Sequence, residues 1–244
     1  MSGLEVFGAS VRGPAHVAER AANQDAWTFA SIGRGRIAVV CDGVGSKAHA
    51  REGSRAACRA VIRAARAWRR TPEASLDVML SLVHVLWRAE FAPRVASECA
   101  CTCLFALVEP DGSGWAGQLG DGAVLVEDAD GMIAPLTTRD PDGFSNLTAA
   151  LGDTPARLSA WTARALGAGT RSVTLCTDGV ADDLRPEALA DFNAWLRLAH
   201  LPLAPNQRWR ALSAALRDWP TPHHLDDKTI AMIVRQGADD EPQR

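Results

Sequence analysis

The residues best suited to chemistry in this chain are aspartates at the ends of apolar runs. Three runs stop at an Asp-Gly pair and a fourth acidic pair opens the last run: Asp42-Gly43, Asp121-Gly122, Asp178-Gly179 and Asp226-Asp227. Strands that begin or end in a carboxylate can bring several carboxylates to one edge of a sheet. Two like charges ~4 Å apart repel by roughly 4 kcal/mol at an effective dielectric constant of ~20. The pattern therefore predicts divalent cations among these side chains.

Asp-Gly is also a common turn signal, and the chain contains six copies. Three of them lie among polar or turn-forming residues and are predicted to be ordinary turns: Asp111-Gly112, Asp130-Gly131 and Asp142-Gly143. For any one of the other three taken alone, a hairpin turn is the alternative to a metal site.

Composition limits the classes of protein to consider. A chain of 244 residues with 47% hydrophobic content can bury a substantial core, and no linker divides it, so we expect one domain over residues 1–244. The net charge of −3 gives no electrostatic case for nucleic acid or an anionic membrane surface. Nothing resembles a signal peptide or a run of ~20 apolar residues, so we expect a cytoplasmic protein, with a monomer as the default.

The six cysteines are predicted to be buried thiols rather than a disulfide framework, since the protein is expected in the cytosol. Cys99, Cys101 and Cys103 alternate, which places them on one face of a strand. Neither Cys-x-x-Cys pairs nor histidines at turn spacing accompany them, so packing is favoured over zinc binding. Cys41 and Cys176 are interpreted in the same way.

The aspartates need strands to position them, and the apolar runs supply candidates. We predict strands at 4–11, 26–31, 36–41, 101–108, 115–119, 123–127, 172–177 and 229–234, and helices at 51–70, 71–91, 186–199 and 207–219. The strands of 101–127 are expected to form an antiparallel meander, the first two helices an antiparallel pair with His84 in or beside its core, and 137–170 a loop-rich flap. Grouped strands and grouped helices favour an α+β fold.

Taken in order, the polar motifs resemble those of a known family. They are Asn23-Gln24-Asp25, Asp42-Gly43-Val44-Gly45, Gly120-Asp121-Gly122, Thr177-Asp178-Gly179-Val180 and Asp226-Asp227-Lys228-Thr229. Their order and spacing over about residues 6–234 resemble the metal-dependent protein phosphatases of the protein phosphatase 2C family. Gly13, His16 and Asn146-Leu147-Thr148 are similar to its compact bacterial branch. The resemblance implies a four-layer α/β/β/α sandwich, with two central antiparallel sheets flanked by helix pairs.

The resemblance also implies a metal centre of two Mn²⁺ or Mg²⁺ ions between the sheets, bridged by a water that attacks phosphorus. By position, Asp42 would bridge both ions, the Gly43 carbonyl would bind one, and Asp25 would act on one metal through water or from outside its ligand shell. Asp178 and Asp226 would complete the other shell, although Asp227 stays an alternative to Asp226. Asp121 matches the acidic position that, with Asp178, can hold a third ion.

Three positions bear on substrate binding and proton transfer. Arg20 lies where family members place a phosphate-gripping arginine, with a surface arginine as the alternative and Lys47 as a weaker candidate for the role. Together with Asp42 and Asp178, Arg20 forms the predicted catalytic set. Position 44 is Val where animal members have a histidine proposed as general acid. His49 could replace that histidine, but a helix-start surface residue is favoured.

The leading hypothesis is an enzyme that hydrolyses phosphoserine or phosphothreonine on proteins and works opposite a Ser/Thr kinase. The alternative is a pseudophosphatase that keeps the fold as a binding module. The retained carboxylates argue against it, because a dead site has no physical reason to keep costly clustered charges. A haloacid-dehalogenase-type phosphatase is set aside because position 44 is Val rather than Asp, and no Walker loop supports a nucleotide hydrolase.

Overall fold

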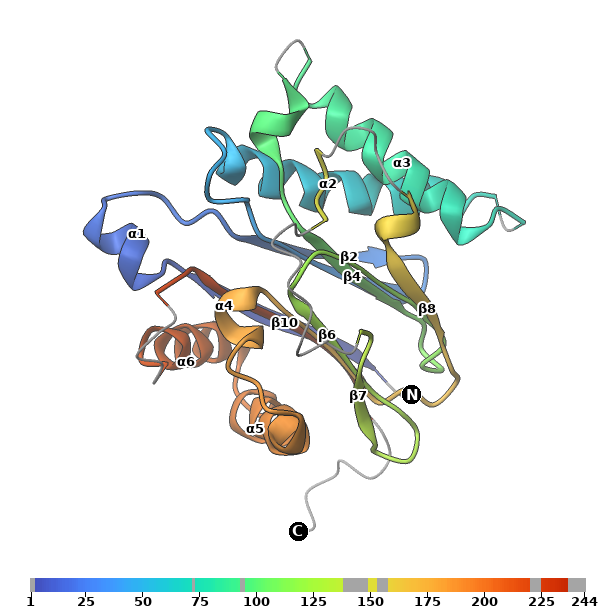
Figure 1. Cartoon of the computed structure of the whole chain (residues 1–244). Coiled ribbons are helices and arrows are strands. Elements are labelled where there is room, and N and C mark those ends of the chain that lie inside the picture. Colours follow the sequence, from blue (N-terminus) through green and yellow to red (C-terminus); the bar gives the residue numbers. More distant parts are fainter. Residues whose placement is uncertain are drawn as a thin grey trace.

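The computed structural model of the chain describes residues 3–71, 73–92, 95–137, 149–152, 158–219 and 225–236. Its centre consists of two five-stranded antiparallel sheets, and helices cover both outer faces of the pair (Figure 1). The predicted α+β sandwich with four layers is therefore confirmed.

The strands that carry the aspartates belong to both sheets. Sheet A has the order β1-β10-β9-β6-β7 and contains β1 (Leu4–Val11), β6 (Ala123–Glu127), β7 (Ile133–Pro135), β9 (Ser172–Cys176) and β10 (Lys228–Arg235). Sheet B has the order β2-β3-β4-β5-β8 and contains β2 (Ala26–Ile32), β3 (Gly35–Cys41), β4 (Cys103–Val108), β5 (Gly114–Leu119) and β8 (Thr162–Leu166). The strands β3 and β9, which precede Asp42 and Asp178, are interior strands of their sheets.

The long helices form the two outer layers. Sheet B is covered by α2 (Ala50–Trp68) and α3 (Leu76–Ala89), and sheet A by α5 (Leu189–His200) and α6 (Pro205–Arg217) (Figure 1). The shorter helical elements are α1 (Pro14–Ala18), α4 (Asp178–Ala181), η1 (Ala96–Cys99), η2 (Leu158–Ala160) and η3 (Pro186–Ala188). In the described part of the chain, no helix combines the length and apolar character that crossing a membrane requires.

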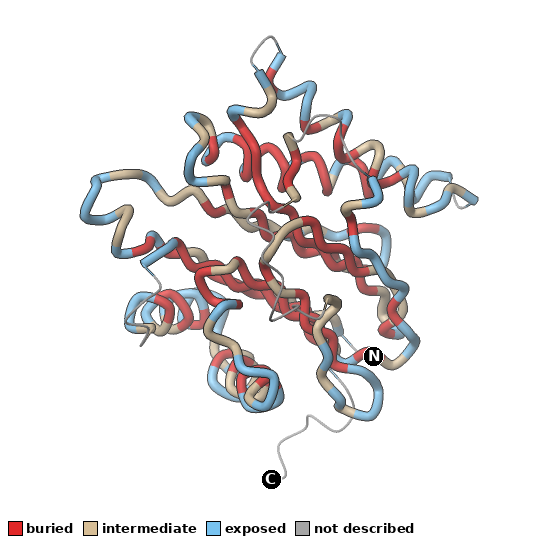
Figure 2. The backbone as a smooth tube through the Cα atoms, viewed as in Figure 1, coloured by how far each residue is buried: buried red, intermediate tan, exposed pale blue. Residues whose placement is uncertain are grey.

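Apolar side chains fill all three spaces between these layers. Figure 2 shows that the buried residues lie along the central strands and on the helix faces turned toward them. Strand β3 illustrates the arrangement. Its Ala38 and Val40 face sheet A, whereas Ile37 and Val39 face α2 and α3. A strand that is buried on both faces needs no polar alternation, and this explains the uninterrupted apolar run of residues 37–41 before Asp42.

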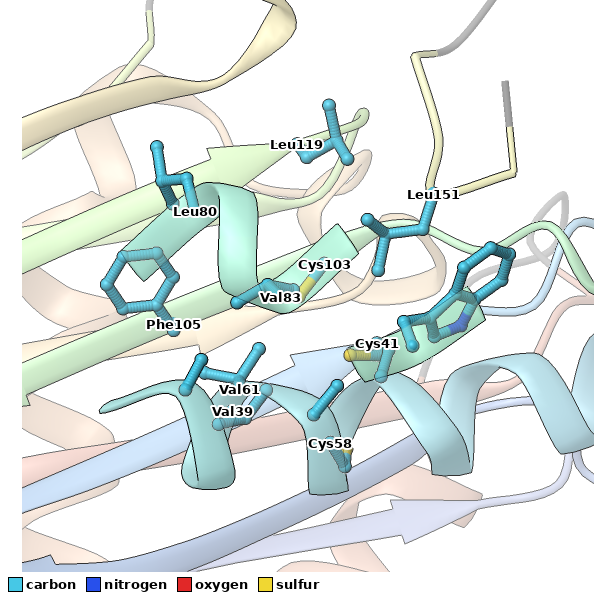
Figure 3. Packing of buried hydrophobic residues seen from close by; sticks show 14 of the residues in the cluster. Val39, Cys41, Cys58, Val61, Leu80, Val83, Cys103, Phe105, Leu119 and Leu151 are labelled. Atoms are coloured by element: carbon cyan, nitrogen blue, oxygen red, sulfur yellow. The ribbon is translucent and has the colours of Figure 1, made fainter. Parts of the chain in front are cut away.

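The cysteines pack in the core, as predicted, but Cys99 ends the 3-10 helix η1 and does not belong to a strand. All six are buried and none forms a disulfide. Cys41 and Cys103 lie beside Cys58 of α2, among Val39, Val61 and Phe105 (Figure 3). Burial, followed by the neighbouring thiols, holds the pKa of Cys41 well above its ordinary value, so the Cys41 thiol is not a nucleophile at neutral pH.

Two predictions about the strands are wrong. The meander predicted for 101–127 stops after β5, because the chain crosses at Gly120-Asp121-Gly122 from sheet B to β6 in sheet A. A Cβ at Gly122 would lie 2.5 Å from the Cys176 carbonyl oxygen, so the crossing brings the backbone hard against β9. Strand β4 begins at Cys103, two residues later than predicted, and Cys101 makes only isolated bridges to Gly43 and Leu151.

The loop predicted for 137–170 contains a strand. Strand β8 forms the edge of sheet B and is exposed at four of its five residues, so it lacks the apolar alternation by which strands are recognised. Most of the predicted flap, including Asn146-Leu147-Thr148 and Asp142-Gly143, lies outside the described residues.

Helix α3 begins at Leu76 with Ser75 at its N-cap, later than the predicted start at Thr71. His84 is buried, and Trp161 Nε1 donates a hydrogen bond to its Nε2 at 3.0 Å.

Candidate metal centre

The predicted site aspartates lie at one end of the two sheets. In sheet B, Asp25 precedes β2 and Asp42 follows β3, and their neighbours Ala26 and Cys41 are paired. In sheet A, Asp178 follows β9 and Asp226 precedes β10, next to the pair Cys176–Ile230. Asp121 lies in the crossing between β5 and β6, whose first residue Ala123 also pairs with Cys176. Both α1 and α4 lie at this end in Figure 1. We call these five aspartates the carboxylate cluster.

Electrostatic coupling shows that the members of the carboxylate cluster are close to one another. Burial, then the charges of Asp25, Asp178 and Asp226, hold the pKa of Asp42 well above its ordinary range. Burial, then the charges of Asp121 and Asp226, raise the pKa of Asp178 to about 6. Without cations, the folded protein therefore resists the full ionisation of this cluster at neutral pH.

Asp25 links the two sheets and leaves one oxygen unsatisfied. Its Oδ2 accepts hydrogen bonds from the hydroxyl groups of Thr177, at 2.9 Å, and Thr229, at 2.7 Å, which both belong to the sheet A side. Its Oδ1 is buried and has no hydrogen-bond partner in the described structure. Burial raises the pKa of Asp25 to about 7, although the hydrogen bonds that it accepts lower it. A buried oxygen without a donor, beside other carboxylates, fits a group of oxygen ligands for hard divalent cations.

The backbone at Asp42 is fixed by Thr102. The Asp42 N–H donates to Thr102 Oγ1 at 3.0 Å, and the Thr102 N–H donates to the Asp42 carbonyl oxygen at 2.8 Å. The next residue must be glycine, because a Cβ at Gly43 would lie 2.6 Å from the Ala50 carbonyl oxygen at the start of α2.

The structure separates two kinds of Asp-Gly. Gly112 and Gly131 have φ angles of 93° and 82°, as expected for glycines in ordinary turns. Gly43 and Gly179 are not in that left-handed region, and close approach of another chain segment explains them instead. A Cβ at Gly179 would lie 2.1 Å from the Asp227 carbonyl oxygen. The Gly179 N–H also donates to Asp178 Oδ1 at 2.7 Å, so this glycine orients a member of the carboxylate cluster.

Asp226 and Asp227, which the sequence leaves as alternatives, have different environments. Asp226 is exposed, and its Oδ1 accepts the Asp227 N–H at 2.7 Å. Asp227 is buried, and both of its oxygens accept backbone N–H groups, from Gly13 at 2.7 Å and from Gln24 at 2.6 Å. Asp226 is therefore the one of the two that stays accessible, whereas both oxygens of Asp227 are already bound to backbone donors.

The cationic candidates lie on the chain segments that precede Asp25 and follow Asp42. Arg20 follows α1, is exposed and has a φ of 58°, which makes it the one non-glycine residue with positive φ in the described part of the chain. His49 occupies the N-cap position of α2, as predicted for a helix-start residue. Lys47 is half-buried.

Sequence reasoning missed the supporting side chains. The hydroxyl groups of Thr102, Thr177 and Thr229 orient the cluster, and the last two stand beside or near site aspartates in the sequence, which is the only signal for them. His16 was also missed as a site residue. Ligand-capable atoms of His16, Asp226 and Asp227 lie within 4.8 Å of one another.

Comparisons with known proteins place the chain in a family. A family model described as "Protein phosphatase 2C" matches residues 12–219. A search of curated protein sequences finds no match.

Solved structures share the fold at low sequence identity. A bacterial serine phosphatase is 15% identical with a TM-score of 0.67, covering 97% of this chain and 99% of its own. RsbX in complex with magnesium is 14% identical with a TM-score of 0.58, covering 97% and 100%. The phosphatase domain of SpoIIE from Bacillus subtilis, solved with a fragment of its regulatory domain, is 12% identical with a TM-score of 0.59, covering 96% and 64%.

Proposed function

We propose, from the premise that the chain belongs to the protein phosphatase 2C family, that it is a metal-dependent protein serine/threonine phosphatase. The observation that carries the proposal is the carboxylate cluster, which gathers aspartates from both sheets and contains the unsatisfied Oδ1 of Asp25. Such a concentration of charge is costly without cations, and a family relationship alone would not require this chain to keep it.

We assign two divalent cations to the cluster, Mn²⁺ or Mg²⁺. Asp42 and the Gly43 carbonyl would hold them from sheet B, and Asp178 and Asp226 from sheet A. Asp25 would act from outside the ligand shell or through water, and Asp121 with Asp178 would hold a third ion. When bound, such cations lower the pKa of water and offset the charge on phosphoryl oxygens. The magnesium complex of RsbX supports this choice of metal by analogy.

The remaining residues of the site hold these groups in place. Thr177 and Thr229 fix Oδ2 of Asp25, so that its other oxygen is available to the cluster. Thr102 fixes the backbone of Asp42 from both sides. Arg20 is proposed to bind the phosphate of the substrate, because it is exposed on the segment that leads to Asp25 and a guanidinium can pair with two phosphoryl oxygens.

The substrate would be a phosphoprotein, and the enzyme would reverse the action of a Ser/Thr kinase as a cytoplasmic monomer. The net charge of −3 gives no electrostatic case for a nucleic-acid substrate.

Turnover of p-nitrophenyl phosphate and of a phosphothreonine peptide tests the proposal. Purified wild type is assayed with EDTA, Mg²⁺ or Mn²⁺ beside Asp178→Asn, which keeps the size of the side chain and removes its charge. We expect hydrolysis that needs metal and is lost in the variant. Wild-type turnover by Asp178→Asn would refute the site assignment. A wild type that neither turns over substrate nor binds Mn²⁺ in calorimetry would establish the pseudophosphatase instead.

A further inference from the structure

Asp227 is a buried carboxylate that the proposed reaction does not use. It lies beside Asp226, is 1% exposed, and is surrounded by donors from a segment more than 200 residues away. Its Oδ1 accepts the Gly13 N–H at 2.7 Å and its Oδ2 accepts the Gln24 N–H at 2.6 Å. His16 Nδ1 lies 2.9 Å from Oδ2. One carboxylate therefore accepts two backbone N–H groups, which lie on either side of α1, and has the imidazole of His16 from α1 beside it.

The same two segments touch along their backbones. The Ala15 N–H donates to the Leu225 carbonyl oxygen at 3.0 Å. A Cβ at Gly13 would lie 2.2 Å from the Asp226 carbonyl carbon, so only glycine permits this approach. Residues 13–24 thus pack against residues 225–227. The Asp227 carboxylate accepts a backbone hydrogen bond at each end of residues 13–24, and we call this pair of hydrogen bonds the Asp227 clamp.

We propose that Asp227 is a positioning residue that sets the distance between Asp25 and Asp226. Asp25 follows Gln24 directly and Asp226 precedes Asp227, so each proposed metal-site residue is one peptide bond away from the contact. The Asp227 N–H also orients the Asp226 carboxylate, at 2.7 Å. Arg20 lies within residues 13–24, so the position of this arginine would also depend on the hydrogen bonds of Asp227 to Gly13 and Gln24. This role rests on the proposed metal-dependent function.

Asparagine is the informative substitution at this position. A carboxylate can accept at both oxygens, whereas an amide has one oxygen and one NH₂ group. In Asp227→Asn, either Gly13 or Gln24 would face an NH₂ donor and lose its acceptor. The size and shape of the side chain stay the same, so the substitution alters only the hydrogen bonds of the Asp227 clamp. Partners that orient metal ligands typically contribute about 10- to 100-fold in metal affinity.

The test combines Mn²⁺ calorimetry with amide hydrogen exchange in four proteins: wild type, Asp227→Asn, Asp226→Asn and Glu127→Gln. Glu127 is the matched control, because it is another buried carboxylate with several partners, namely Ser172, Asn193 and Arg197, and it lies at the far end of β6 from Asp121. We expect Asp227→Asn to weaken Mn²⁺ binding by about 10- to 100-fold and to speed exchange in residues 13–24. Asp226→Asn should weaken binding without faster exchange, and Glu127→Gln should change neither quantity.

Unchanged exchange or unchanged Mn²⁺ affinity in Asp227→Asn would overturn the positioning role. Equal losses in Glu127→Gln would also overturn it, because the effect would then be one of general stability. A wild type that binds no Mn²⁺ would instead refute the proposed function, and this outcome is visible before any variant is compared.

Discussion

At the scale of single residues, the energetic cost of the carboxylate cluster gives a pH prediction. The pKa values of Asp25 and Asp178 are about 7 and about 6 in the metal-free fold, against an ordinary value of 3.8. The folded state therefore keeps protons that the unfolded state releases. The stabilising contribution of these two protonated carboxyl groups to the free energy of unfolding is complete below about pH 4 and is lost as the pH rises through 6 and 7.

Metal-free protein should accordingly melt at a lower temperature at pH 8 than at pH 5. Asp178→Asn should recover about 1–3 kcal/mol of unfolding free energy at pH 8, since it removes one of the repelling charges. Thermal melts in EDTA across this range provide the measurement, and saturating Mn²⁺ should reduce the slope in wild type. Equal pH slopes for the two metal-free proteins would contradict the predicted repulsion.

Arg20 combines an unfavourable backbone with a proposed role in substrate binding. A non-glycine residue at a φ of 58° carries a cost of roughly 1–2 kcal/mol, which glycine avoids. Both Arg20→Gly and Arg20→Ala should raise KM with little change in kcat, if the guanidinium binds phosphate equally in the ground and transition states. Arg20→Gly should also be about 1 kcal/mol more stable than Arg20→Ala. Unchanged kinetics in both variants would make Arg20 a surface residue.

The sequence identified the carboxylate cluster better than its surroundings. Asp42 and Asp178 follow long apolar runs, so both the strand and the carboxylate at its end are visible in the pattern. Thr102 and Thr229 bind Asp42 and Asp25 from chain segments that are distant in the sequence. No local sequence pattern shows which segments will lie next to each other in the fold. The different environments of Asp226 and Asp227 could not be predicted either, because the two side chains are chemically identical and the donors Gly13 and Gln24 are distant in the sequence.

At the scale of elements, a buried polar network holds α5 on sheet A. The Asn193 side-chain amide donates to Glu127 Oε2 and to Ser172 Oγ, both at 2.9 Å, and Thr174 Oγ1 donates to its oxygen at 2.8 Å. Asn193→Ala should therefore destabilise the fold by about 2–3 kcal/mol, because it leaves buried partners unpaired. Asp191→Ala, on the exposed side of the same helix, should stay within about 0.5 kcal/mol. Chemical denaturation measures both, and a small loss for Asn193→Ala would show that packing alone holds α5.

His200, at the end of α5, gives the opposite pH dependence from the carboxylate cluster. It is buried, and burial followed by the charge of Arg208 lowers its pKa below 6.5. The unfolded state then binds the extra proton first, so stability is lost as the pH falls below about 6.5. His200→Phe keeps an aromatic ring against Trp195, whose centroid is 5.0 Å away, and should reduce this loss. Thermal melts of wild type and His200→Phe at pH 5 and pH 7 provide the comparison. The same difference in melting temperature between the two pH values in both proteins would contradict the prediction.

Helices and strands could be predicted where burial gives the sequence a recognisable pattern of apolar residues. The helical stripe of α2 and the apolar runs of β3, β9 and β10 appear close to their predicted bounds. Strand β8 was not visible, because an exposed edge strand needs no apolar face. The crossing of the chain at Gly120-Asp121-Gly122 was mistaken for a hairpin turn, since a change of sheet depends on tertiary contacts with β9 rather than on turn residues.

At the scale of the whole molecule, the carboxylate cluster joins the two halves of the sandwich. Asp25 and Asp42 belong to sheet B with α2 and α3, whereas Asp178 and Asp226 belong to sheet A with α5 and α6. The halves also share the apolar layer between the sheets. Cations bound by both pairs would therefore stabilise the sandwich across its central interface, in addition to their chemical role.

Calorimetric unfolding should consequently show one transition that Mn²⁺ shifts as a whole. At a free concentration 100 times its Kd, a ligand adds about 2.7 kcal/mol, which corresponds to roughly 5–10 °C for a chain of this length. Asp178→Asn should lose most of this shift, because it removes a proposed ligand on the sheet A side. If the two halves unfolded separately and Mn²⁺ moved only one of the transitions, the cluster would belong to one half, and the single cooperative domain proposed for residues 1–244 would be wrong.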